Sequence, residues 1–150
     1  MERAIDLAVA NAASGAGGPF GAVIVRDGVV IAEGSNAVVR TADPTAHAEV
    51  VAIRNAAAAL GTHDLSGCEL FASCEPCPMC LGAILWARID GVYFAASQAD
   101  AAAAGFDDSL FYEQFRKPAA DRIVPMRQQY VSDPIRPFAA WKSNSGKVAY

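Results

Sequence analysis

The residues most able to do chemistry are cysteines gathered in one short stretch of the chain. All four fall within thirteen positions, and two of them, Cys77 and Cys80, stand three apart with Pro78 between them. In a reducing compartment such clustering is typical of a metal site or of catalysis rather than of disulfides. Proline favours the first position of a helix, so both cysteines are expected at a helix start, whose positive end favours the metal-binding thiolate. Two thiolates could then point at one zinc ion.

A third ligand can be chosen from only two histidines, His47 and His63. His47 is the better candidate because it falls in the first turn of a predicted helix, whereas His63 follows a helix-ending glycine and is expected on the surface. Three protein ligands leave a fourth position for water, which is typical of catalytic zinc. Bound zinc lowers the pKa of water toward about 7, and Glu49 is well placed to move its proton. These residues predict hydrolytic chemistry with one zinc ion per subunit.

The two motifs together match a known pattern. His47-Ala48-Glu49 followed by Pro76-Cys77-Pro78-Met79-Cys80 fits the H-x-E…P-C-x-x-C signature of zinc-dependent base deaminases. Taken alone, the C-x-x-C pair could be structural or redox-active, and a lone histidine could be a core or surface residue. The agreement of spacing, flanking prolines and helix starts favours a catalytic zinc site.

Composition limits what kind of protein carries this motif. The chain has 150 residues, of which 53% are hydrophobic and 19% are charged, as expected of a single folded domain over residues 1–150. The net charge of −4 disfavours nucleic acid as a partner, since such proteins usually carry a basic surplus. Every apolar run is far shorter than the roughly 20 residues of a membrane span, and no secretory signal is visible. We expect a cytoplasmic location and no membrane partner.

Strand and helix patterns alternate along the chain and predict an α/β domain. A helix over residues 5–13 is followed by a glycine-rich loop, and two β-branched runs around Asp27-Gly28 predict an antiparallel hairpin. An alanine-rich helix over residues 46–60 carries His47 and Glu49 in its first turn. The remaining predicted elements are strands at 69–73 and 91–95, an edge strand at 123–130, helices at 79–87, 97–104 and 135–142, and a helical turn at 107–115.

Three segments carry a narrower resemblance. They are Pro44–Glu49 (PTAHAE), Ser73–Ile84 (SCEPCPMCLGAI) and Ala104–Ser109 (AGFDDS). They resemble the bacterial guanine deaminases of the cytidine-deaminase-like fold, and the resemblance runs nearly end to end. It implies a three-layer α/β/α domain with a mixed five-stranded sheet flanked by helices, a homodimer, and hydrolysis of guanine to xanthine and ammonia. Glu49 would take a proton from the attacking water and deliver protons to the purine ring nitrogen and the leaving amine.

The same resemblance implies the residues that bind the purine. Phe20 and Trp86 also fit plain core packing, and Asp107 or Glu113 could replace Asp108 as the carboxylate that accepts from the purine donors. Cys68 and Cys74 are expected to be structural. In this implied set, the Asn36 amide holds the heterocycle, Phe20 and Trp86 pack against the ring, and the Ala48 amide lies near the reacting group. Asp108 accepts hydrogen bonds from N1–H and the exocyclic amine. Tyr150 closes the pocket of the partner subunit, because a C-terminal segment (about 131–150) is exchanged between subunits.

Other functions share parts of this pattern. A tRNA adenosine deaminase has the same zinc motif, but the C-terminal region offers only Arg136, Lys142 and Lys147 to attract RNA. A guanosine deaminase would need room for the ribose. From another class, a zinc-stabilised interaction domain without catalysis would use the cysteines structurally, lose its fold without metal and leave Glu49 dispensable.

Overall fold

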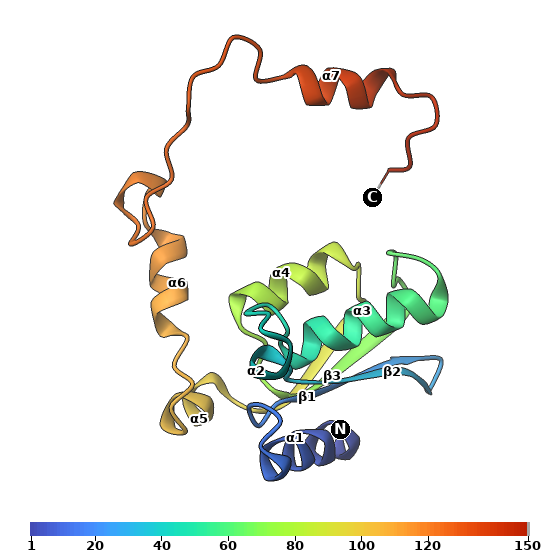
Figure 1. Cartoon of the computed structure of the whole chain (residues 1–150). Coiled ribbons are helices and arrows are strands. Elements are labelled where there is room, and N and C mark those ends of the chain that lie inside the picture. Colours follow the sequence, from blue (N-terminus) through green and yellow to red (C-terminus); the bar gives the residue numbers. More distant parts are fainter. Residues whose placement is uncertain (150) are drawn as a thin grey trace. The chain divides into compact units, whose positions relative to one another are not determined.

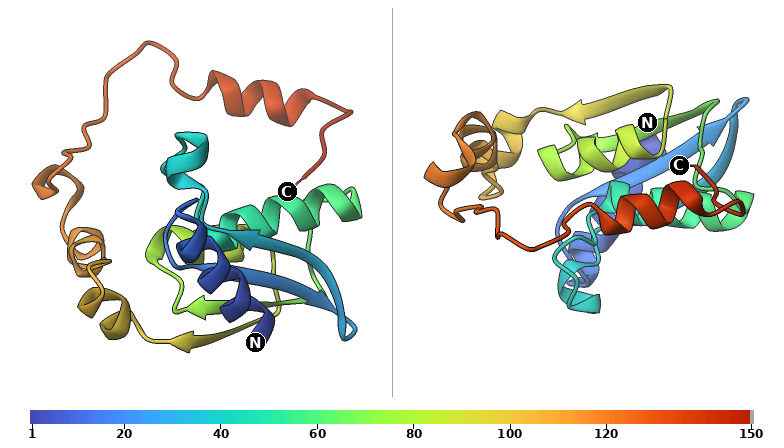
Figure 2. Two further views of the ribbon diagram at one scale, coloured as in Figure 1. Left: turned by 60° about the horizontal axis from the view of Figure 1, so that its bottom comes forward. Right: turned by 90° about the horizontal axis from the view of Figure 1, so that it is seen from above.

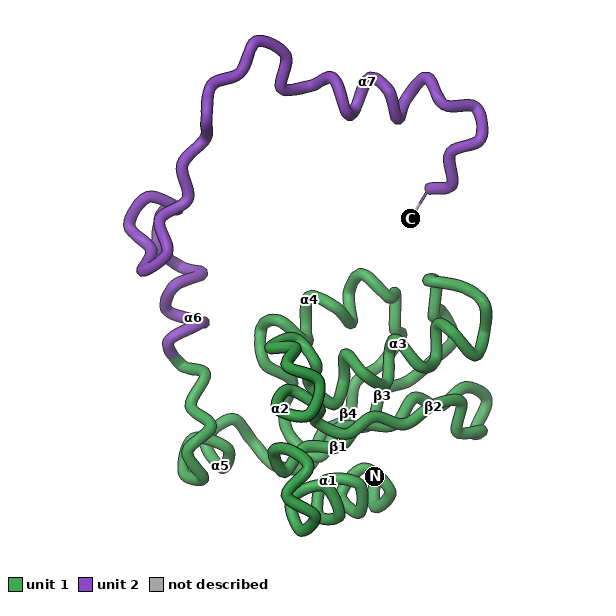
Figure 3. Tube along the Cα trace, viewed as in Figure 1, with its two compact units in different colours: residues 1–109 green, residues 110–150 purple. Residues whose placement is uncertain are grey.

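The computed structural model describes residues 1–149 of the chain. The chain forms two compact units that divide after Ser109 (Figure 3). Unit 1, residues 1–109, contains the sheet and the zinc-site candidates, and unit 2 begins at Leu110. The expected Tyr150 lies outside the described residues. A single domain over residues 1–150 stays a prediction.

Unit 1 is built on a mixed four-stranded sheet with the strand order β2-β1-β3-β4. β1 pairs antiparallel with both β2 and β3, whereas β4 runs parallel to β3. Asp27 and Gly28 connect β1 to β2, and both have the positive φ that a tight hairpin turn requires. The predicted hairpin is therefore confirmed. The strands are β1 (Gly21–Arg26), β2 (Val29–Ser35), β3 (Cys68–Cys74) and β4 (Gly91–Ala96).

Helices cover both faces of this sheet (Figures 1 and 2). Side chains alternate along β1, so that Ala22 and Ile24 face the core under α3 while Gly21 abuts α1. The α/β/α layering expected from the sequence is confirmed. The helices of unit 1 are α1 (Glu2–Ser14) on one face, α3 (Ala48–Leu60) and α4 (Pro78–Trp86) on the other, and the short α2 (Val38–Thr41) and α5 (Gln98–Ala103).

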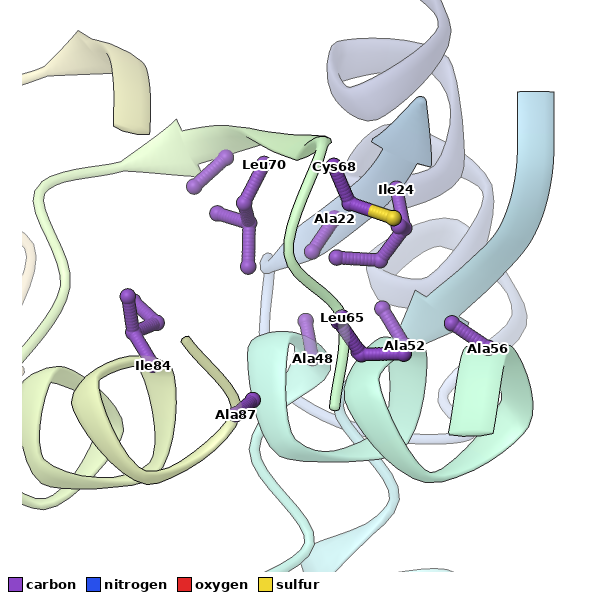
Figure 4. Close-up of a cluster of buried hydrophobic side chains, with 11 residues drawn as sticks. Ala22, Ile24, Ala48, Ala52, Ala56, Leu65, Cys68, Leu70, Ile84 and Ala87 are labelled. Atoms are coloured by element: carbon purple, nitrogen blue, oxygen red, sulfur yellow. The ribbon is translucent and has the colours of Figure 1, made fainter. Parts of the chain in front are cut away.

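The core of unit 1 lies between the sheet and the pair α3 and α4 (Figure 4). Leu70 and Ile24 are fully buried there, and each such side chain contributes about 1.5–3 kcal/mol of burial free energy. The alanines of α3, including Ala52, allow the helix backbone to approach the sheet closely. At Gly34 of β2 a Cβ would collide with the backbone of α3 at Ala48 and Ala52. This contact fixes where the N-terminus of α3 lies.

Unit 2 contains little regular structure. None of the residues in its helical elements is buried. The elements are α6 (Ser109–Arg116), which starts at the boundary, a 3-10 turn η1 (Ala119–Asp121) and α7 (Arg136–Ser143). Among the described residues, no helix has the length and hydropathy that crossing a membrane requires.

The fifth strand expected from the sequence is absent from residues 1–149. Residues 123–130 form no strand, and the sheet has four strands rather than five. Pro125 lacks the backbone N–H that a strand ladder uses, and the apolar residues of this segment do not alternate regularly with polar ones. The predicted edge strand at 123–130 is therefore wrong.

Candidate metal centre and active site

Three ligand atoms meet where the N-termini of two helices approach each other. His47 is the residue before α3, Cys77 is the residue before α4, and Cys80 lies in the first turn of α4. His47 Nδ1 lies 3.6 Å from Cys77 Sγ and 3.5 Å from Cys80 Sγ, and the two sulfurs are 3.6 Å apart. The ligand atoms of the predicted group His47, Cys77 and Cys80 thus lie within 4.8 Å of one another.

This triangle has the dimensions of a zinc site. Zn–S bonds of about 2.3 Å and Zn–N bonds of about 2.0 Å at tetrahedral angles place sulfurs about 3.8 Å apart and sulfur about 3.5 Å from nitrogen. The observed separations of 3.5–3.6 Å agree with these values within about 0.2 Å. One imidazole and two thiolates also form a donor set that zinc prefers. The residues therefore fit zinc and leave one coordination position for water.

A local network of hydrogen bonds holds the loop before α3 and so fixes the position of His47. The Asp43 carboxylate accepts hydrogen bonds from the backbone N–H of Thr45 at 2.8 Å and from its hydroxyl at 2.7 Å, which forms a tight Asx turn. Arg54, which lies within α3, donates a hydrogen bond to the other carboxylate oxygen of Asp43 at 3.1 Å. The turn and the helix are thereby tied together on either side of His47.

The pKa values of the two thiols are shifted in opposite directions. The hydrogen bonds with Cys80 and, to a smaller extent, with His47 together lower the pKa of Cys77 to about 4, although burial opposes this. The hydrogen bond with Cys77 and burial raise the pKa of Cys80. The neighbouring Cys77 thiolate raises the pKa of His47, against its burial. Cys77 is therefore a thiolate at neutral pH, and a bound Zn²⁺ would deprotonate the second thiol.

Glu49 is a buried carboxyl in the first turn of α3, only 8% exposed. Its pKa is raised, mainly by burial and also by the charge of Cys77, while the charge of His47 lowers it. A raised pKa makes the carboxylate a stronger base, and perturbed pKa values of this kind are typical of general acid–base residues. This environment suits the proton-transfer role predicted for Glu49.

Three residues of the predicted substrate set lie around the start of α3 and the end of β2. Asn36 is buried, 8% exposed, and its side-chain oxygen accepts the N–H groups of Gly18 and Val38 at 3.4 Å each. Phe20 packs against the core and meets Phe106 edge to face, with ring centroids 4.9 Å apart. Ala48, 1% exposed, is the first residue of α3. Their contacts with substrate stay predictions.

The three candidate carboxylates occupy different environments. Asp107 accepts the backbone N–H of Ser109 at 2.9 Å and so serves the start of α6, and Glu113 pairs with Lys117 at 2.6 Å in unit 2. Asp108 is half-buried in unit 1 and accepts a hydrogen bond of 2.6 Å from Gln98 Nε2. Gln98 also donates its backbone N–H to the carboxylate of Glu75 at 3.0 Å, and Glu75 is the residue after β3. These bonds tie Asp108 to the start of the segment that carries Cys77 and Cys80.

The remaining predicted residues have varied positions. Trp86 is the last residue of α4 and is 69% exposed, so its packing against a purine also stays a prediction. Cys68 and Cys74 are buried free thiols, as expected for structural cysteines, and His63 is exposed as expected.

Sequence reasoning missed two polar residues that organise this region. Gln98 holds Asp108, and Asn11 donates to the backbone at Gly18 and Asn36. A signal for Asn11 was present, because Ala4, Ala8 and Asn11 follow the helical spacing of one buried face. A polar residue on an otherwise apolar face indicates a specific hydrogen-bonding duty.

Comparison with known proteins places the chain in a family. Residues 1–96 match the model of the cytidine and deoxycytidylate deaminase zinc-binding region. The chain is 53% identical to the guanine deaminase of Bacillus subtilis (strain 168) over 150 residues, covering 100% of this chain and 96% of that protein. The crystal structure of B. subtilis guanine deaminase superposes with a TM-score of 0.97 over 99% of this chain and 95% of that chain.

Other relatives match less of the chain. The guanine deaminase of Nitrosomonas europaea is 41% identical with a TM-score of 0.68, over 71% of this chain and 62% of that one. The tRNA-specific adenosine deaminase of Aquifex aeolicus is 47% identical over 78 residues, 52% of each protein. Among these three relatives, the match with the guanine deaminase of B. subtilis extends over the full length of the chain. The chain belongs to the cytidine and deoxycytidylate deaminase zinc-binding family, and within it to the guanine deaminases.

Proposed function

We propose that this protein is a zinc-dependent deaminase that hydrolyses guanine to xanthine and ammonia. The observation that carries the proposal is the triangle of His47, Cys77 and Cys80 with the buried Glu49 beside it, in a chain 53% identical to a guanine deaminase along its whole length. Zinc held by the three ligands would supply hydroxide near neutral pH by lowering the pKa of a coordinated water toward about 7.

Glu49 carries the protons of the reaction. It accepts one proton from the attacking water as the new C2–O bond forms and gives that proton to the ring nitrogen. It then accepts the proton of the new hydroxyl group and gives it to the amine, so that the C2–N bond breaks, ammonia leaves and the C2=O bond forms. Its burial suits the first step, because a carboxylate whose pKa is raised by burial is a stronger base than an exposed one. One residue thus serves as base and then as acid.

The purine would be held by residues of unit 1 on either side of the zinc ligands. Guanine presents N1–H and its exocyclic amine as adjacent donors, and Asp108 supplies a carboxylate that can accept both. The amide of Asn36 would hold the heterocycle, and Phe20 and Trp86 would pack against the flat ring. Support for this assignment comes from the burial of Asn36 and from the hydrogen bond that joins Asp108 to Gln98, which itself bonds Glu75 at the end of β3.

The biological unit would be a homodimer in which the C-terminal segment, about residues 131–150, is exchanged and Tyr150 closes the partner's pocket. Support comes from unit 2, where Phe111, Phe115 and Phe138 are all more than half exposed. Aromatic side chains in such number favour association with another protein surface. Light scattering of the purified protein should therefore give the mass of a dimer, and a monomer at micromolar concentration would contradict this part of the proposal. A cytoplasmic location likewise stays a prediction.

The two alternatives within the fold differ in substrate. The tRNA-specific adenosine deaminase of A. aeolicus matches about half of this chain, and the net charge of −4 does not favour a polyanion. Ammonia release should be measured from guanine, guanosine, adenine, cytosine and cytidine with the zinc-loaded protein. Turnover of guanine above the others supports the proposal, whereas turnover of another base without guanine would overturn it. No turnover of any base in a zinc-loaded protein would favour the interaction-domain alternative.

A further inference from the structure

Asn11 is a buried polar residue on the inner face of α1, only 8% exposed. Its side-chain nitrogen donates to two backbone carbonyls, the one of Gly18 at 2.8 Å and the one of Asn36 at 2.9 Å. An asparagine NH₂ group has two donors, so both are used. Asn11 therefore joins two segments that are eighteen positions apart in the sequence, the glycine-rich loop after α1 and the end of β2.

Asn36 returns a bond to the same loop. Its side-chain oxygen accepts the backbone N–H of Gly18 at 3.4 Å, and its own backbone N–H donates to the carbonyl of Phe20 at 3.1 Å. The carbonyl of Gly18 also accepts the N–H of Phe20 at 2.8 Å. Gly18 is thus held on its carbonyl side by Asn11 and on its N–H side by Asn36.

The packing at this junction leaves no room for adjustment. A Cβ at Gly17 would overlap the carbonyl oxygen of Asn36 and approach the Asn11 side-chain nitrogen within 2.9 Å. The loop is therefore pressed directly against the backbone of the residue assigned to hold the purine. Small movements of Asn11 or of the loop must move Asn36 or Phe20, because close-packed groups transmit displacements.

We propose that Asn11 is a positioning residue for substrate binding, which orients Asn36 by clamping the Gly17–Gly18 loop to the end of β2. This inference rests on the proposed function, since it acts through a residue assigned to the purine. Asn11 itself touches neither the zinc ligands nor, on this account, the substrate. It should therefore change the affinity for guanine rather than the chemical step.

The test is the steady-state kinetics of Asn11→Ala and Asn11→Asp with guanine, on zinc-loaded protein. Asn11→Asp keeps the volume of the side chain but removes both N–H donors. Each variant should raise KM by about tenfold, the factor that corresponds to about 1.4 kcal/mol, while kcat changes little. A partly unfolded preparation would lower kcat and leave KM unchanged, so the two explanations are separated.

Asn55 provides a matched control. Its side-chain nitrogen also donates to a backbone carbonyl of β2, that of Glu33, at 2.8 Å, but from the exposed side of α3. Asn55→Ala should keep the wild-type KM. The decisive comparison is the double variant Asn11→Ala with Asn36→Ala: if Asn11 acts through Asn36, adding Asn11→Ala to Asn36→Ala should raise KM no further.

The possible outcomes separate this inference from the proposed function. No guanine turnover by the wild-type protein would overturn the proposed function and this inference with it. Normal wild-type turnover together with an unchanged KM in Asn11→Asp, or a KM effect that persists in the Asn36→Ala background, would overturn the positioning role alone. Failure of both Asn11 variants to fold would also overturn it, because Asn11 would then serve the fold and not the site.

Discussion

Replacing Gly34 by alanine should damage both the fold and the zinc site, because the added methyl group meets the backbone of α3. A Cβ at this position would lie 2.5 Å from the backbone nitrogen of Ala52 and would overlap the carbonyl oxygen of Ala48, whereas ordinary contact begins near 3.4 Å. The helix and the strand must therefore separate by about 1 Å. Ala48 is adjacent to His47, so the displacement reaches the first zinc ligand.

Two magnitudes follow from this displacement. Overpacking of this kind costs about 1–3 kcal/mol of unfolding free energy. A shift of about 1 Å at a catalytic constellation can lower the turnover rate about 100-fold. Urea unfolding and ammonia release from guanine would measure the two effects, with bound zinc determined on the same samples.

The matched control is Gly82→Ala in α4. A Cβ at Gly82 meets nothing within 4 Å, and glycine inside a helix is less favourable than alanine by about 0.8–1.0 kcal/mol. Gly82→Ala should therefore be at least as stable as the wild type. If Gly34→Ala also kept wild-type stability, zinc content and activity, the account of how α3 is seated would be refuted.

Three further predictions concern the metal, the loop and the substrate. A zinc chelator should lower the Tm of the wild type and of Cys68→Ala but leave the Tm of Cys77→Ser unchanged, because bound metal stabilises only a protein that holds it. Equal Tm shifts in all three proteins, measured by differential scanning fluorimetry, would contradict the ligand assignment. The hydrogen bonds from Thr45 hold the pKa of Asp43 below its ordinary value. The stability that they contribute is therefore present above the unfolded-state pKa and is lost as the pH falls through the lower pKa of the folded state. Asp43→Asn should be less stable than the wild type at pH 7, and the difference between their urea midpoints should vanish in acid. Asp108→Asn should lower kcat/KM for guanine by about 10- to 100-fold, as expected for a charged hydrogen-bond acceptor, whereas an equal loss in Asp107→Asn would refute the choice between the two.

The zinc site could be predicted from the sequence because its information is local. His47, Cys77 and Cys80 each lie at a helix start that alanine-rich and proline-flanked segments mark clearly, and the chemistry of the ligands restricts how they can combine. The hairpin at Asp27-Gly28 was equally local, since its two residues specify the turn. The helix starts and the hairpin turn depend only on the residues next to them in the sequence, so they can be predicted without knowledge of the rest of the fold.

Features that depend on distant partners could not be predicted. The segment 123–130 resembles a strand in composition, but a strand also needs a neighbour with a free edge and a compatible register, which composition does not encode. The short helix α2 was not among the elements predicted from the sequence. Asn11 bonds to residues 7 and 25 positions away, so its partners emerge only once α1, the loop and β2 are in place.

The central claim is that Glu49 carries protons for guanine hydrolysis at a zinc site. The most direct measurement is ammonia release from guanine by folded, zinc-loaded Glu49→Gln, compared with Glu69→Gln, whose carboxylate accepts a hydrogen bond from Tyr93 on the sheet. We predict that Glu49→Gln loses activity by about 10²- to 10⁴-fold, the usual contribution of general acid–base catalysis, and that Glu69→Gln stays near wild type. Guanine turnover by Glu49→Gln at the wild-type rate would contradict the account.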